Sequence, residues 1–308
     1  MITQQKNNLL KKSAAIASIA TAILLMIFKL VAFLRTDSLA IFSSFIDSAT
    51  DLLASAISFI AVYFSTKNAS TDHRYGYGKS EALSALLQAL FVGGSGVFVI
   101  IDGLKRLIHP VSVMQTSTGI VIMLLSIFAT LLLVLFQTYV ANKTNSLAIK
   151  ADRAHYTVDF LTNSAVIISL LLVHFTGFMY FDVIAALFIS VYLLYNAYSL
   201  AKEAVEQITD KELSPEIRKN IEDIVRGSKG IHGMHDFRTR NLGDAYYFEL
   251  HLEIDGSISL LKAHELTEAV EQKISELYPE SQILIHQDPY GIHEDRLDHK
   301  IEGSCKLD

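Results

Sequence analysis

Six long apolar stretches fill the first two thirds of the chain. They run over residues 14–34, 39–64, 82–104, 118–140, 157–175 and 179–200. Each is close to the ~20 residues that take an α-helix across a lipid bilayer. None contains a proline, so each helix can satisfy its own backbone hydrogen bonds in lipid. The pattern predicts an α-helical membrane protein with six transmembrane helices.

The basic residues between these stretches indicate how the helices are oriented. Nine lie on the side that holds the N-terminus, the last three of them between the fourth and fifth stretches: Lys6, Lys11, Lys12, Lys67, Arg74, Lys79, Lys143, Lys150 and Arg153. The opposite side has three, Arg35, Lys105 and Arg106. Because positively charged loops stay on the cytoplasmic side, we expect both termini to be cytoplasmic.

After Leu200 the chain becomes polar and its pattern is that of a small mixed domain. Ser214 and Pro215 are typical of a helix start, and that helix is expected to end at Gly227. A second helix is predicted over residues 263–277, and strands over 235–241, 246–255 and 282–287. The order α-β-β-α-β is typical of helices packed on one face of a sheet. We therefore expect a transmembrane domain at 1–206, a cytoplasmic α+β domain at 207–292 and a flexible tail at 293–308.

The composition narrows the function further. Hydrophobic residues make up 51% of the chain and charged residues 19%, a balance too apolar for an ordinary soluble enzyme. The net charge of −6 gives no basic footprint for nucleic acid. The single cysteine, Cys305, excludes a disulfide scaffold and a cysteine zinc cluster. No H-E-x-x-H motif supports a metallohydrolase, so we expect a protein that is not an enzyme.

Four ionisable residues lie on the predicted membrane helices at matching spacing. Asp47 and Asp51 are four residues apart on the second helix, as are His155 and Asp159 on the fifth, so each pair shares one helix face. Ionisable groups at membrane depth are costly unless they are paired, hydrated or bound to metal. One imidazole and three carboxylates can complete a tetrahedral shell around a divalent cation. Either pair alone would fit a helix-end cap, but both together favour a metal site. Protonation of such ligands releases the metal, and histidine titrates near pH ~6.5, so the site could exchange metal for protons.

The residues of these stretches resemble a known family. The motifs are SLAIFSSFIDSATDLLAS, HRYGYGKSE and ADRAHYTVDFLTNS, followed by GMHDFRTR, HLEID, KAH and IHQDP. From about Ala14 to Pro289 the chain is similar to the cation diffusion facilitator family, in its bacterial YiiP/FieF branch. The resemblance implies a homodimeric antiporter of the bacterial inner membrane that exports divalent metal for protons by alternating access. Zinc is the implied cargo, with cadmium and iron also carried, and the cytoplasmic domain is implied to be ferredoxin-like, as in metallochaperones.

The resemblance also assigns roles to residues. The transport site falls on Asp47, Asp51, His155 and Asp159. Zinc ligands of the cytoplasmic domain fall on His235, His251, His264, His286 and Asp288, with Gln287 behind them. Charged contacts between the two domains fall on Lys79, Asp210 and Arg240. A further family site, in the loop after the second helix, keeps only His73 with Asp72 beside it, because Ser70 and Tyr77 replace the other ligands.

Two other functions stay open at this point. One is a membrane-tethered metal sensor without transport, against which the ligands at membrane depth argue. The other is an exporter selective for iron or manganese, because a carboxylate-rich site discriminates poorly among metals. Lys29 lies near the middle of the first helix and has no assigned partner, although a lysine there needs one or must reach the membrane surface.

Overall fold

The computed structural model describes residues 2–36, 39–108, 117–176, 181–243, 245–292 and 295–301. They divide into two compact units, Met1–Val205 and Glu206–Asp308. This division lies one residue from the expected boundary at 206/207.

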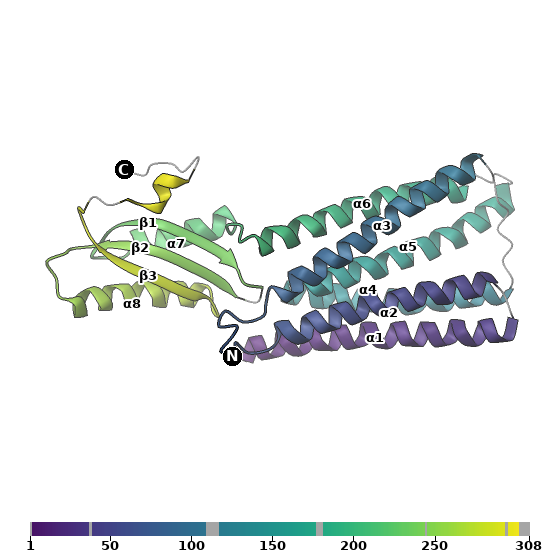
Figure 1. The fold of residues 1–308 in the computed structure, drawn as a ribbon, viewed down its shortest axis with the longest axis horizontal. Coiled ribbons are helices and arrows are strands. Elements are labelled where there is room, and N and C mark those ends of the chain that lie inside the picture. The colour runs from purple at the N-terminus through teal and green to yellow at the C-terminus, as the bar shows by residue number, and fades with distance from the viewer. Residues whose placement is uncertain are drawn as a thin grey trace. The chain divides into compact units, whose positions relative to one another are not determined.

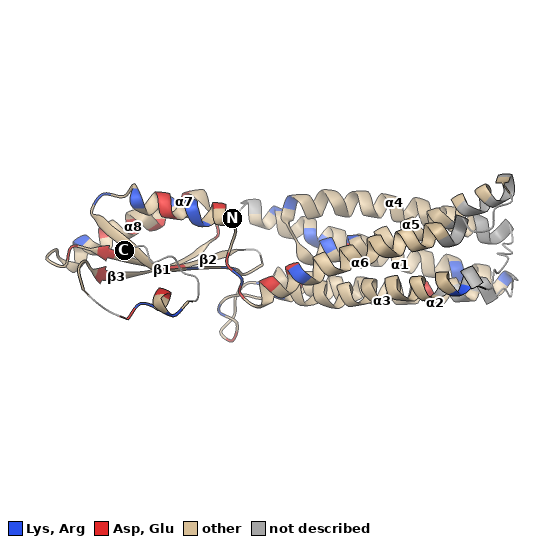
Figure 2. Ribbon diagram, turned by 90° about the horizontal axis from the view of Figure 1, so that it is seen from above, with Lys and Arg blue, Asp and Glu red and all other residues tan. Residues whose placement is uncertain are grey.

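The first unit is built from six long helices. They are α1 (Ile2–Thr36), α2 (Leu39–Ser65), α3 (Ser80–Ile108), α4 (Ser117–Thr144), α5 (Leu147–Thr176) and α6 (Phe181–Ile208), as Figure 1 shows. Along most of their length the helices have few charged residues (Figure 2). Within the described residues, 5 helices are long and apolar enough to cross a membrane, namely all except α5. The first half of α5 contains five ionisable residues, Lys150, Asp152, Arg153, His155 and Asp159.

The start of α5 corrects one sequence prediction. The apolar stretch begins at residue 157, but the helix begins at Leu147, so Lys150 and Arg153 are helical and do not belong to a loop. Hydropathy locates the part of a helix that lies in lipid, whereas the helix itself can continue into water. Lys150 is stabilised there by an ion pair with Glu203 of α6, whose Nζ to Oε1 distance is 2.7 Å.

Small side chains allow the helices to pack closely. A cluster of buried residues joins α1, α2, α4 and α5 through Ala14, Ala15, Ala61, Val62, Val140, Ala141, Ala148 and Ile149. On the other side of α5, α3 packs on α6 around Val92, Leu193 and Ala197. A Cβ atom added at Gly96 of α3 would lie 3.2 Å from Cγ of Leu194, so glycine is what permits this approach. Interfaces made of small residues are typical of membrane helices.

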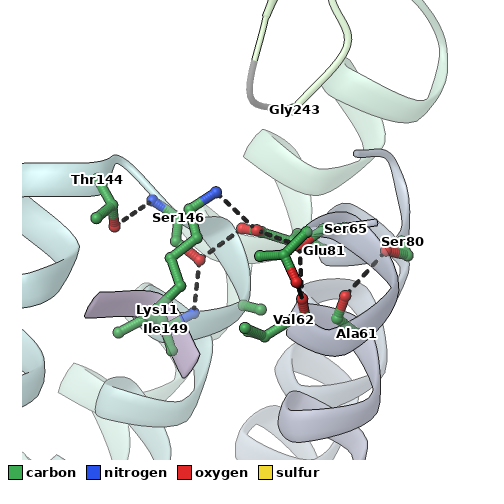
Figure 3. Close-up of polar contacts among 12 residues, drawn as sticks. Lys11, Ala61, Val62, Ser65, Ser80, Glu81, Thr144, Ser146, Ile149 and Gly243 are labelled. Atoms are coloured by element: carbon green, nitrogen blue, oxygen red, sulfur yellow. Dashed lines mark hydrogen bonds and ion pairs between the residues drawn. The ribbon is translucent and has the colours of Figure 1, made fainter. Parts of the chain in front are cut away.

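A buried polar cluster connects the helices at one end of this unit (Figure 3). Glu81 of α3 accepts hydrogen bonds from Lys11 Nζ at 2.9 Å and from Ser65 Oγ at 2.8 Å. Ser146 Oγ donates to its other oxygen at 2.5 Å. The Lys11 and Glu81 side chains are each 4% exposed. This Glu81 cluster therefore ties α1, α2 and α3 to the turn before α5.

The second unit has the predicted order of elements. It consists of α7 (Pro215–Arg226), β1 (Ile231–Asn241), β2 (Tyr246–Ile254), α8 (Leu260–Leu277), β3 (Gln282–Pro289) and a short 3-10 helix, η1 (Leu297–Lys300). Ser214 caps α7 as expected, because its side chain accepts from the backbone N–H of Ile217. The sheet order is β1-β2-β3, with β1 and β2 antiparallel and β2 and β3 parallel. Both helices contribute to one core, which includes Ile221, Val225, Phe248, Leu250, Val270 and Ile274.

The tail differs from the expectation of a flexible segment at 293–308. Its described part, 295–301, lies against β1, where the Asp236 carboxylate accepts the backbone N–H groups of Leu297 and Asp298. Burial raises the pKa of Asp236, but these two hydrogen bonds outweigh it and hold the pKa below the usual value for an aspartate. A polar sequence alone does not reveal such partners, because they lie about sixty residues away in the chain.

Candidate metal centres

Helices α2 and α5 bring three of the four predicted membrane ligands together. His155 Nε2 lies 3.1 Å from Asp51 Oδ1 and 3.9 Å from Asp159 Oδ2. One ligand atom from each of these residues lies within 4.8 Å of the others. Among the described residues, Asp159 Oδ2 is buried without a hydrogen-bond partner. A buried carboxylate oxygen that faces an imidazole and a second carboxylate is suited to bind a cation. We call these three residues the membrane cluster.

Asp47 does not join the membrane cluster. It lies one helical turn before Asp51 on α2, its side chain is exposed, and it is outside the group whose ligand atoms lie within 4.8 Å. The i,i+4 spacing places Asp47 on the same helix face as Asp51, but the facing pair on α5 meets α2 at the level of Asp51. The structure thus joins three of the four predicted residues.

Lys29 acquires a partner that the sequence did not reveal. Its side chain is 8% exposed, and Nζ donates to Ser48 Oγ on α2 at 2.7 Å. Its charge also interacts favourably with Asp47 and Asp159. A buried lysine is stable only beside such groups, so the acidic residues explain its position at mid-helix.

Asp152 is a buried acidic residue that sequence reasoning missed. It lies on α5 one turn before His155, is 0% exposed, and accepts from Gln137 Nε2 of α4 at 2.6 Å. Beside it, the Tyr156 hydroxyl lies 2.8 Å from Ser55 Oγ of α2. Hydropathy did not mark it, because residue 152 precedes the apolar stretch that begins at residue 157. The available signal was an acidic residue at helical spacing from His155.

In the second unit, strand register aligns three of the predicted histidines. His235 of β1 pairs with His251 of β2, and His251 pairs with His286 of β3. Asp288 lies among them, with Oδ2 at 2.8 Å from His251 Nδ1 and 3.4 Å from His235 Nε2, and Oδ1 at 3.1 Å from His286 Nε2. We call these four residues the sheet cluster.

The donor atoms of the sheet cluster fit a metal ion. The His235 side chain is only 4% exposed, and its Nε2 lies beside the Asp288 carboxylate. The other ring nitrogen, Nδ1, lies 3.1 Å from Glu253 Oε1. A carboxylate that accepts from one ring nitrogen leaves the lone pair of the other free for a metal. One ligand atom each from His251, His286 and Asp288 also lies within 4.8 Å of the others.

Two predicted residues lie away from the sheet cluster. His264 on α8 is 64% exposed, and its ring lies 4.0 Å from Glu268 of its own helix. Gln287 lies between His286 and Asp288 on β3, and because side chains alternate along a strand it is on the opposite face. Sequence reasoning instead missed Glu253 and Asp236, although Glu253 shares the polar face of β2 with His251.

The remaining predicted residues have other contacts. In the loop after α2, the His73 ring stacks on Tyr77 with centroids 4.4 Å apart, and Tyr77 in turn contacts Ser70. Asp72 is exposed, and the structure groups neither residue with further metal-binding side chains within its described ranges. In the second unit, Arg240 Nη1 lies 3.7 Å from Asp210 Oδ2. Lys79 belongs to the first unit, so its contact with this pair stays a prediction.

Known proteins match nearly the whole chain. A profile described as the cation efflux transmembrane domain matches residues 15–209, and one for the cytoplasmic domain of cation efflux proteins matches residues 213–290. The cation-efflux pump FieF of Serratia proteamaculans is 38% identical over 283 residues, which cover 92% of this chain and 94% of the relative. The pump of the same description from Yersinia pestis is 40% identical over 281 residues, covering 91% and 93%.

Solved structures similar to this chain cover its last part. One is the metal-bound C-terminal domain of the CzcD transporter from Thermotoga maritima. It is 28% identical, with 26% of this chain and 93% of that chain covered, at a TM-score of 0.25.

Proposed function

This chain belongs to the cation efflux family of multi-pass membrane transporters, and on that premise we propose that it exports zinc in exchange for protons. Efflux of a divalent cation follows from membership of the family. The proton coupling, the zinc preference and the homodimeric assembly belong to our proposal. So do the inner-membrane location and the cytoplasmic position of both termini, which the distribution of Lys and Arg supports.

The membrane cluster is the observation that supports this function most strongly. Asp51, His155 and Asp159 offer one nitrogen and two carboxylate oxygens from two facing helices. We propose that they bind the transported metal and that Asp47, one turn away, supplies the fourth ligand after its side chain rotates. A metal sensor would not need ligands on helices that cross the membrane, so the cluster favours transport.

Proton exchange follows from the chemistry of these ligands. A neutral imidazole and ionised carboxylates bind metal, and their protonated forms do not. Metal that enters from the cytoplasm would displace protons, and protons that enter from the opposite side would release the metal. The change of access must occur between these two steps, because a site open to both sides would leak.

The ligand set supports zinc as the principal cargo. Zinc accepts nitrogen and carboxylate oxygen in a four-coordinate shell. Cadmium and ferrous iron are the expected secondary cargoes, because oxygen-rich sites select weakly among divalent metals. An exporter selective for iron or manganese is the alternative, and competition among the four metals for one flux distinguishes it.

We further propose that the sheet cluster binds zinc as a regulatory ligand that stabilises the homodimer. The three histidine rings that surround the buried Asp288 carboxylate support this role. Transport ligands lie in the other unit, so loss of the sheet cluster should alter the regulation of flux and leave its chemistry intact.

The test is zinc flux into proteoliposomes that contain a zinc-sensitive dye and, in parallel, a pH-sensitive dye. With an imposed proton gradient we expect zinc movement in one direction and proton movement in the other. Zinc movement that ignores the gradient would contradict proton coupling. Zinc binding without any flux would favour the sensor.

A further inference from the structure

Reciprocal hydrogen bonds attach the tail to the strand that positions His235. The Asp236 carboxylate accepts the N–H of Leu297 at 3.0 Å and that of Asp298 at 2.8 Å. In return, Asp298 Oδ2 accepts the N–H of Asp236 at 2.7 Å. Asp236 has a φ of 50° at an irregularity in the β1–β2 pairing, between His235 and Arg238. Few non-glycine residues adopt this conformation, and here the tail satisfies the backbone and side-chain groups that it turns outward.

A second contact leads from the tail directly to the His235 ring. Arg296 Nη2 lies 2.5 Å from Glu253 Oε1, and the same oxygen lies 3.1 Å from His235 Nδ1. Gly233 faces Glu253 across the strands, and a Cβ atom there would lie 2.9 Å from Glu253 Oε2. The glycine thus leaves room for the carboxylate to lie across β1. Arg296, Glu253, His235 and Asp288 form a continuous line of polar contacts.

We propose that residues 295–301 form a strap that positions His235 for metal binding in the sheet cluster, with Arg296 and Glu253 as its positioning residues. The proposal rests on the proposed metal site in the sheet cluster. Glu253 accepts the Nδ1 proton of His235 and so presents Nε2 to the metal. Arg296 balances the charge of Glu253 and fixes its orientation, which keeps the carboxylate on the ring.

The coupling between strap and metal must act in both directions. If the docked strap raises the affinity for metal, bound metal must raise the stability of the docked strap by the same factor. The tail would then report the occupancy of the sheet cluster at the surface of the domain. A tail that is only a structural brace would not show this dependence.

The experiment measures zinc affinity in the full-length protein in detergent. An Asp51→Ala background removes binding at the membrane cluster, so that the titration reports the sheet cluster. In this background Arg296→Gln should weaken zinc binding about 10- to 100-fold, the usual effect of losing a group that orients a ligand. Lys300→Gln removes the same charge from an exposed position of the tail and should leave the affinity unchanged. Arg296→Lys should lie between the two, because it keeps the charge without the planar fork.

A second variant tests the same link without changing the tail. Gly233→Ala should push the flexible end of Glu253 away from the ring and reduce the affinity to a similar extent. Hydrogen exchange completes the test. Zinc should slow exchange of the Leu297 and Asp298 amides in the parent, and this protection should disappear in Arg296→Gln.

The outcomes separate the two proposals. Zinc binding that is present in the parent, lost in His235→Ala, but equal in Arg296→Gln and Lys300→Gln would overturn the strap alone. No zinc binding in the parent would overturn the metal site of the sheet cluster and the role of the strap with it. Weaker binding in Arg296→Gln and Gly233→Ala, with zinc-dependent protection of the tail in the parent, would support both.

Discussion

The Glu81 cluster allows a quantitative prediction about how the helices are held together. Lys11 and Glu81 are each 4% exposed, and two hydroxyl groups complete the shell of the carboxylate (Figure 3). Lys11→Met keeps a flexible side chain of similar length but leaves a buried carboxylate without its cation. Removal of one partner of a buried ion pair costs about 3–5 kcal/mol.

The assay is thermal unfolding of the purified protein in detergent. For a unit of this size, each kcal/mol lowers the melting temperature by about 2–4 °C, so Lys11→Met should lower it by about 6–20 °C. Ser146→Ala removes one hydrogen bond to a charged group and should cost about 1.5–3 kcal/mol. Lys12→Met is the matched control, because Lys12 makes no hydrogen bond or ion pair within the described part of the chain.

The double variant Lys11→Met, Glu81→Leu decides the interpretation. Replacing both partners removes the unpaired charge, so the double variant should regain much of the stability that the Lys11→Met protein loses. Two results would refute the reasoning. One is a Lys11→Met protein that melts like Lys12→Met, and the other is a double variant less stable than Lys11→Met.

Three further predictions concern the membrane helices. His155→Asp should shift preference from zinc towards manganese or iron, because it replaces the only nitrogen ligand with oxygen; an unchanged preference in flux competition would remove His155 from the site. Lys29→Met removes a cation near the carboxylates, so the apparent KM for zinc should fall, whereas Lys29→Arg should keep it; transport kinetics that do not distinguish the two would contradict this. Gly96→Ile should separate α3 from α6 and lower the free energy of unfolding by about 1–3 kcal/mol, the cost of overpacking, and with it the melting temperature. Gly94→Ile should not, because nothing lies within 4 Å of its Cβ position. Equal melting of the two glycine variants would show that this contact does not stabilise the protein.

The sequence predicted the helices well because length and apolarity are local properties. All six predicted helices are present, and the second unit has the predicted α-β-β-α-β order. The ends of the helices were less predictable. The start of α5 lies ten residues before its apolar stretch, because hydropathy marks only the apolar part of a helix and does not register partners such as Glu203 beside Lys150.

For the ligands, too, spacing within one helix was predictable from the sequence, whereas contacts between distant parts of the chain were not. Spacing of four residues predicted that each pair, on α2 and on α5, shares one helix face, and the structure brings Asp51 together with the α5 pair. The level at which α2 meets α5 is a tertiary property, so the exclusion of Asp47 could not be read from spacing. In the sheet, the row of His235, His251 and His286 depends on inter-strand register and on the irregularity after His235. The strap depends on contacts of the tail with β1 and β2, which span 62 and 43 residues of the chain.

Zinc flux through the Asp51→Ala protein tests the central claim most directly. Asp51 is the α2 residue that contacts His155, and its loss removes the α2 ligand from the membrane cluster. Asp72→Ala, in the exposed loop after α2, is the control for loss of one acidic residue. In proteoliposomes with a proton gradient, our account predicts background flux for Asp51→Ala and normal flux for Asp72→Ala, with both proteins melting like the parent. Normal zinc flux in a folded Asp51→Ala protein would contradict the account.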